Sequence, residues 1–257
     1  MAHPVAMNSA DILRIRVRSQ LIADSRATTP RDVVSRLLAM QAQDYLGSLW
    51  AIGLRLPGAT STDVEHAVAE RTIVRTWPMR GTLHFVAAED VRCLLPLLTP
   101  RILARAARRE RQLELDERTF ARAGELFTER LLGGRRLTRP DAMAVLEADG
   151  ITTGGQRGYH ILWRLAQEGL LVLGPVAGKQ QTFVLLDEWL PSPSIQTVAC
   201  SSREEQLTRL AKRYYDGHGP ATVDDLARWA DIAKSEARSA LEAAADTLES
   251  AEHEGSR

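Results

Sequence analysis

Two glutamines separated by one alanine, Gln41 and Gln43, are the residues whose type and spacing most suggest chemistry. They follow the apolar face of a predicted helix that includes Leu37, Leu38 and Met40. If that helix breaks or bends here, both side chains leave it on the same side and can face a cavity. Each amide offers one acceptor oxygen and two donor hydrogens, so the pair can hold a water in a fixed orientation without carrying charge. This suits a reaction in which the leaving group is already activated and only the attacking water must be positioned. The alternative is two ordinary surface amides.

A second group of polar residues surrounds a predicted strand–turn–strand, in which Pro78 to Gly81 form the tip between strands 73–77 and 82–86. Arg75, Arg80 and His84 lie on or near this hairpin, which can enter a DNA groove or meet phosphates. Alternatively, Thr82 and His84 face the core and hold the hairpin through hydrogen bonds. The sequence leaves both readings of His84 open and favours DNA contact for Arg80.

Further candidate DNA contacts lie in the second half of the chain. Gln156, Arg157 and Tyr159 open a predicted helix after two glycines, a position that suits phosphate contact through free backbone N–H groups. Lys179 lies in the loop between two later strands. A basic run from Arg101 to Arg111 either follows a DNA backbone or forms a solvated face paired with nearby glutamates.

Familiar catalytic motifs are absent from the sequence. It contains no Walker loop, dinucleotide glycine fingerprint, HExxH or Gly-x-Ser-x-Gly, and its six histidines lack metal-ligand spacing. Two cysteines support neither a disulfide framework nor a cysteine-ligated zinc site. We therefore expect no metal and no organic cofactor. No run of about 18 apolar residues predicts a membrane span, and the N-terminus lacks a secretion signal, so we expect a cytoplasmic protein with no membrane partner.

Net charge is zero over 257 residues, but its distribution is uneven. Residues 1–190 carry 25 basic and 21 acidic side chains, a balance of +4, whereas residues 191–257 carry 8 and 12, a balance of −4. Of the 33 basic residues, 30 are arginine. One explanation for this preference for arginine over lysine is codon bias. The other is that the planar guanidinium of arginine is suited to binding phosphate and guanine.

The predicted elements repeat. Short helices followed by a hairpin occupy residues 1–87 and again 88–190, where the second pair of strands is predicted at 170–173 and 182–186. Residues 191–257 add three helices with no hairpin, after a linker predicted at Pro191–Ser194. The expected fold class is mainly α with short β-hairpins, built from tandem winged helix-turn-helix units of which the third lacks its wing. Such units favour double-stranded DNA as the partner, although they also serve as protein–protein scaffolds.

Three segments carry a resemblance to a known family. Met40 to Gln43, Arg75 to His84, and Gly217 to Thr222 resemble the AlkZ/YcaQ-like DNA glycosylases, and the Gln-x-Gln pattern looks like the AlkZ-like branch. The resemblance covers residues 9 to about 240. It implies three tandem winged helices, a concave DNA-binding surface, and excision of N-alkylated purines, including those in interstrand crosslinks. It also implies that Gln41 and Gln43 are the catalytic pair.

The chemistry implied by the resemblance needs little acid catalysis. Alkylation at N7 of guanine places positive charge on the base and weakens its glycosidic bond, so an oriented water can attack C1′. Gln41 and Gln43 are expected to position that water and to stabilise the developing positive charge through their carbonyl oxygens. Asp44 either adds a full negative charge or is a solvated turn residue.

The chain looks C-terminally shortened beside the family. A missing third wing is expected to leave apolar residues uncovered, which allows association of an otherwise monomeric protein, and residues from Leu248 onward are expected to be disordered. The alternative function is therefore a winged-helix DNA-binding protein or regulator without catalysis.

Overall fold

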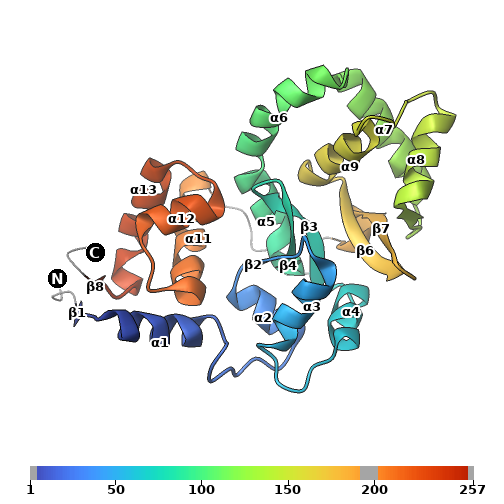
Figure 1. The fold of residues 1–257 in the computed structure, drawn as a ribbon. Coiled ribbons are helices and arrows are strands. Elements are labelled where there is room, and N and C mark those ends of the chain that lie inside the picture. The colour runs from blue at the N-terminus through green and yellow to red at the C-terminus, as the bar shows by residue number, and fades with distance from the viewer. Residues whose placement is uncertain (1–4, 192–201, 254–257) are drawn as a thin grey trace.

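The computed structural model describes residues 5–191 and 202–253. It is mainly helical, with a six-stranded antiparallel sheet near the middle and a separate helical group that includes both ends of the described chain (Figure 1). Most of the predicted linker Pro191–Ser194 lies outside the described residues, as do Cys200 and residues 254–257.

The first unit contains α2 (Pro30–Arg36), β2 (Ala39–Gln41), α3 (Tyr45–Gly53), α4 (Ser61–Ala69), β3 (Ile73–Met79) and β4 (Thr82–Ala87). The N-terminus of α2 is set by neighbouring residues, because Thr29 and Asp32 form a capping box and Pro30 occupies the first turn. The predicted strands near 73–77 and 82–86 are confirmed.

The second unit repeats the order helix, strand, helix, helix, strand, strand. Its elements are α7 (Glu117–Leu131), β5 (Leu137–Thr138), α8 (Arg139–Ala148), α9 (Arg157–Gln167), β6 (Leu171–Ala177) and β7 (Gln180–Leu185). Two helices, α5 (Ala88–Leu98) and α6 (Pro100–Gln112), connect the units. α5 ends at Leu98 and α6 begins at Pro100, whereas Pro96 lies inside α5.

The two hairpins join edge to edge into one sheet of order β2-β4-β3-β6-β7-β5, with Arg75 paired to Leu173 at the junction. At the tip of the β3–β4 hairpin, Arg80 and Gly81 both have positive φ angles, of 53° and 69°. A Cβ on Gly81 would lie within 3.8 Å of both Trp163 and Ile102, so the tip packs against the second unit. On the side of Gly81 the tip therefore contacts α6 and α9, while Arg80 at the same tip is exposed.

The third unit contains α11 (Arg203–His218), α12 (Val223–Ala230) and α13 (Lys234–Ala244), followed by the 3₁₀ turn η1 (Ala245–Thr247). β8 (Ala251–Glu252) then pairs in parallel with β1 (Val5–Ala6). The prediction of disorder from Leu248 is wrong as far as His253, because these backbone hydrogen bonds tie the segment to the other end of the chain. α1 (Ser9–Ser19), at the start of the first unit, lies beside α11 (Figure 1) and leaves Leu13, Ile15 and Val17 exposed.

Buried side chains form three apolar clusters, one for each unit. The clusters do not follow the predicted boundaries throughout. Val91, Leu94 and Leu95 of α5, which the sequence assigns to the second unit, share a core with Leu207 and Leu210 of α11. A short helix, α10 (Leu186–Trp189), contributes to the same core. No helix in the described ranges is long and apolar enough to cross a membrane.

Candidate active site

The two glutamines lie on an extended segment rather than on a bent helix. α2 ends at Arg36, and Leu38, with a φ of 62°, turns the chain into β2. Gln41 pairs with His84 of β4. β2 ends at Gln41, and Gln43 lies in the bend just after it. Gln41 and Gln43 are both exposed, while Ala42 between them is fully buried.

Gln43 presents its amide nitrogen, not its oxygen, to the space beside the strand. The backbone N–H of Leu83 donates to Gln43 Oε1 at 3.2 Å. A backbone N–H needs an acceptor, so this bond fixes the orientation of the carboxamide. The expectation that both carbonyl oxygens face the reacting centre is therefore corrected for Gln43, whose two N–H donors point outward.

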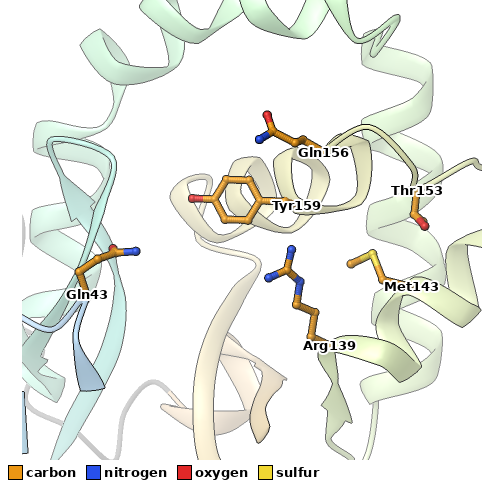
Figure 2. Close-up of a pocket in the computed structure, with 6 residues that line it drawn as sticks. All are labelled: Gln43, Arg139, Met143, Thr153, Gln156 and Tyr159. Atoms are coloured by element: carbon orange, nitrogen blue, oxygen red, sulfur yellow. The ribbon is translucent and has the colours of Figure 1, made fainter. Parts of the chain in front are cut away.

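Gln43 lines an open cavity of about 550 Å³ that it shares with residues of the second unit (Figure 2). The other lining residues come from α8, α9 and the loop between them: Arg139, Met143, Thr153, Gln156 and Tyr159. This volume lies within the range typical of small-molecule sites. Gln41 is not among the lining residues.

The wall opposite Gln43 combines an aromatic ring with a cation. Figure 2 shows the Tyr159 hydroxyl pointing toward the Gln43 amide across the cavity, with Arg139 beside the ring. The Arg139 guanidinium lies 5.7 Å from the Tyr159 ring centroid. Burial raises the pKa of Tyr159, an effect that Trp77 and Arg139 partly oppose. The phenol is therefore protonated at neutral pH and offers both a hydrogen-bond donor and a π-face.

Gln156 is held in a left-handed conformation at the start of α9, with a φ of 77°. Its Oε1 accepts a hydrogen bond from Arg109 Nη2 at 3.0 Å. A non-glycine residue in this conformation is strained, and such strain is common at functional sites. The neighbouring Arg157 is not a cavity residue, because its guanidinium donates to the backbone carbonyls of Thr152, Leu113 and Glu114.

The hairpin residues are mostly turned inward. His84 is fully buried, its Nδ1–H donates to the Thr82 carbonyl at 2.9 Å, and its Nε2 therefore accepts from Arg80 Nη2 at 3.2 Å. Burial lowers the pKa of His84 to about 4, so the ring is neutral at pH 7 and cannot serve as a general acid. Of the two readings of His84, the structure shows the core-facing one. Arg80 itself remains exposed.

Arg75 departs from its expected position at the surface. Its side chain is only 4% exposed, and its guanidinium donates to the carbonyl of Ala42. The Ala42 carbonyl and the Tyr45 ring contact the guanidinium, and the predicted contact with DNA is therefore not possible in this conformation.

Asp44 and Lys179 have simple surroundings. Asp44 is the N-cap of α3, where its Oδ1 accepts from the Gly47 N–H at 3.2 Å, the position of a turn residue. Lys179 is exposed in the turn between β6 and β7. Neither is among the cavity-lining residues.

The basic run on α6 is divided between contacts and solvent. Arg105 pairs with Asp231 of the third unit, and Arg109 contacts Gln156. Glu110 pairs with Arg164 rather than with its own helix. Part of the run therefore connects elements of the protein, so it is not a uniform stripe for DNA.

Sequence reasoning missed three cavity residues, Arg139, Met143 and Thr153. A signal for Arg139 exists in the repeat of elements. It follows β5 directly, just as Ala42 and Gln43 follow β2 in the equivalent part of the first unit. Within the described residues, no group of three or more histidine, cysteine, aspartate or glutamate side chains could hold a metal ion.

Comparisons with known proteins agree on one kind of relative. A family model described as DNA glycosylase AlkZ-like matches residues 34–257, which include both glutamines. The chain is 28% identical over 236 residues to an interstrand DNA cross-link repair glycosylase of Streptomyces sahachiroi. That alignment covers 84% of this chain but 59% of the relative, so the chain spans about three fifths of the relative's length.

A solved structure of Streptomyces sahachiroi DNA glycosylase AlkZ has the same fold. The TM-score is 0.77 at 23% identity, and the match covers 98% of this chain and 69% of that one. The mainly helical architecture with its small antiparallel sheet is thus shared.

Proposed function

The chain belongs to the AlkZ-like DNA glycosylase family, and from that premise we propose that it is a monofunctional DNA glycosylase acting on N-alkylated purines. The observation that carries this proposal is the cavity shared by Gln43 and the Tyr159 wall. A base in a duplex is reached only when it leaves the stack. The cavity offers such a base an aromatic face on one side and amide donors on the other.

The proposed architecture for DNA binding is tandem winged helices. The repeated order of helix, strand, helix, helix, strand and strand in the first two units supports it. We retain residues 1–87, 88–190 and 191–257 as the three units, with α5 packing into the core of the third. Arg80 and Lys179, both exposed, are the basic candidates for contact with DNA.

The proposed reaction is displacement of the base at C1′ by water. The bond between C1′ and N9 breaks, and its electron pair neutralises the cationic N7-alkylguanine. A water oxygen bonds to C1′, and its extra proton passes to solvent. The leaving group needs no proton, which fits a site where buried His84 is neutral and where Asp44 caps a helix.

Gln43 contributes as a hydrogen-bond donor in this scheme. One N–H can hold the water through one lone pair while the other lone pair attacks, or it can hold an acceptor atom of the departing base. Gln41, exposed at the end of β2, is the remaining amide for the water or the sugar. No charge is required of either side chain. We extend the substrate class to interstrand crosslinks, because the Streptomyces relative is named an interstrand DNA cross-link repair glycosylase.

The test uses purified protein in excess over a duplex that contains one N7-methylguanine, followed by alkali cleavage of abasic sites. Wild type is expected to release the base. Q43A is expected to lower the single-turnover rate by about 10²–10³-fold, and Q41A to lower it as well, with affinity for the duplex nearly unchanged. Gln20→Ala, which truncates an amide at the end of α1, is the matched control and should keep the wild-type rate.

Two results contradict the proposal. Retained DNA binding with no release of base at any enzyme excess indicates a non-catalytic binder. Release that is equally fast in Q43A and Q41A indicates that the catalytic groups lie elsewhere.

A further inference from the structure

A buried arginine lies directly behind the glutamine segment. Arg75, in the middle of β3, donates from Nε and from Nη2 to the Ala42 carbonyl oxygen, at 3.1 and 2.6 Å. Its guanidinium also lies 5.0 Å from the centroid of the Tyr45 ring. The Nε–Nη2 edge of the guanidinium therefore contacts the carbonyl of the residue between Gln41 and Gln43.

The charge of Arg75 has no carboxylate partner among the ion pairs of the described residues, and its buried Nη1 has no hydrogen-bond partner there. Burial lowers the pKa of Arg75 to about 10, so the group is still cationic at pH 7. Burial and Glu65 raise the pKa of Tyr45 to about 12, so this residue supplies a ring face and no counter-charge. An unpaired buried cation is costly, and a simple packing role does not require one.

The contacts continue from Ala42 to the cavity. The Ala42 N–H donates to the Leu83 carbonyl at 2.7 Å, and the Leu83 N–H donates to Gln43 Oε1. The peptide groups around Ala42 are thus held by Arg75 on the carbonyl side and by Leu83 on the amide side. Leu83 therefore holds both residues, Ala42 through its carbonyl oxygen and Gln43 through its N–H.

We propose that Arg75 is a positioning residue for the reaction: its buried guanidinium holds the Ala42 carbonyl and thereby fixes Gln43 with its amide N–H groups turned into the cavity. The inference rests on the proposed glycosylase function for its kinetic effect. A cation cannot stabilise the positive charge that develops on the sugar, so the contribution of Arg75 is geometric. It acts through Gln43 and does not touch the substrate.

The kinetic test compares R75K and R75M with wild type in single-turnover excision of N7-methylguanine. A small displacement of a positioning group costs up to about 100-fold in rate. R75M is expected to lower the maximal rate by about that factor with the half-saturating protein concentration within about twofold of wild type. R75K keeps the charge and one donor group, and its maximal rate is expected to be about tenfold higher than that of R75M.

A double-mutant comparison separates positioning from simple loss of stability. In a Q43A background, R75M is expected to lower the rate by less than about twofold, because its effect passes through a side chain that is no longer present. Arg55→Met is the matched control. Arg55 is half-buried, and its guanidinium donates to the backbone carbonyls of Gln20 and Ala51, as that of Arg75 donates to the Ala42 carbonyl. It is not part of the glutamine segment. It should lower the melting temperature as R75M does and leave the rate unchanged.

Hydrogen exchange at the Leu83 backbone amide reports on its hydrogen bond to Gln43 and does not require enzymatic activity. Its exchange is expected to accelerate at least tenfold in R75M and in Q43A but not in R55M. If wild type excises nothing while Leu83 responds in this way, the glycosylase proposal fails and the positioning of Gln43 stands. If Leu83 exchange is unchanged in R75M, if R75M and Q43A effects multiply, or if R75M weakens DNA binding with the rate intact, the positioning role is overturned.

Discussion

At the scale of single residues, the candidate site is organised by backbone hydrogen bonds to neutral groups. Gln43 takes its orientation from the Leu83 N–H, and His84 takes its tautomer from the Thr82 carbonyl. Neither side chain is charged at neutral pH. These two neutral groups add no charge beside a substrate that carries its own positive charge, and the one cationic side chain that lines the cavity in the described residues, Arg139, lies on the opposite wall.

Tyr159 is the residue whose ring we expect to hold the extruded base. Stacking of a base on an aromatic side chain is worth about 1–3 kcal/mol by alanine substitution. Y159A should therefore raise the half-saturating protein concentration for N7-methylguanine excision by about 5- to 100-fold. Y159F keeps the ring and should stay within a few-fold of wild type. Measured single-turnover progress curves over a range of protein concentrations check this, and an equal loss in both variants would indicate that the hydroxyl matters and the ring does not.

At the scale of elements, the molecule uses one arrangement twice. Both units place a helix, a strand, two helices and a hairpin in the same order, and both begin helices with capping boxes such as Thr29–Asp32 and Thr138–Asp141. The repeat also puts Gln43 just beyond the first strand of one unit and Arg139 just beyond that of the other. The cavity between them is thus a product of the pairing of two similar units.

The two hairpins of the repeat have different environments. The β3–β4 tip packs against Trp163, whereas the β6–β7 tip at Gly178–Lys179 has nothing within 4 Å of a Cβ placed at Gly178. We therefore expect the β6–β7 tip, which carries Lys179, to reach a DNA backbone. Lys179→Ala should weaken binding to any duplex sequence, lower the slope of log K against log salt by about 1, and leave the excision rate at saturation unchanged.

The control for this prediction is Lys234→Ala on α13, whose ammonium pairs with Asp224. Fluorescence anisotropy over a series of salt concentrations measures both slopes. An unchanged slope in the Lys179 variant would mean that this hairpin does not contact phosphate.

At the scale of the whole molecule, the third unit docks on the first through close backbone contact. A Cβ on Gly217 of α11 would lie 2.3 Å from the Arg36 carbonyl oxygen at the end of α2. Around this point Arg36 donates to the Asp216 carbonyl and Ser19 to the Gly219 carbonyl. The Gly217–Thr222 motif, which contributes to the family resemblance, thus lies at a junction between units rather than at the cavity.

Substitution of Gly217 tests this junction. Gly217→Ala forces α11 and α2 apart and should lower the free energy of unfolding by about 1–3 kcal/mol, measured by thermal or urea unfolding. Gly53→Ala is the matched control, because Gly53 is also helical and its added Cβ would meet only one atom, at 3.8 Å. It should be neutral or slightly stabilising. Equal stability of both variants would show that the close approach in α11 relaxes at no cost.

The sequence by itself determined the features that depend on near neighbours. Capping residues, proline positions and alternating apolar residues predict α2, the two hairpins and the repeated units, because each depends on contacts within a few residues. The sequence also singled out Gln41 and Gln43, but they lie at the end of β2 and in the bend after it, not on a broken helix.

Only the tertiary structure decided which groups meet in the site. Gln43 takes its orientation from an N–H that lies 40 residues further along the chain, and the facing wall comes from α8 and α9 of the other unit. Arg75 has the residue type of a DNA contact, but the pairing of β3 with both β4 and β6 buries it. Burial and sheet register depend on every element that packs together, so no local pattern of residues specifies them.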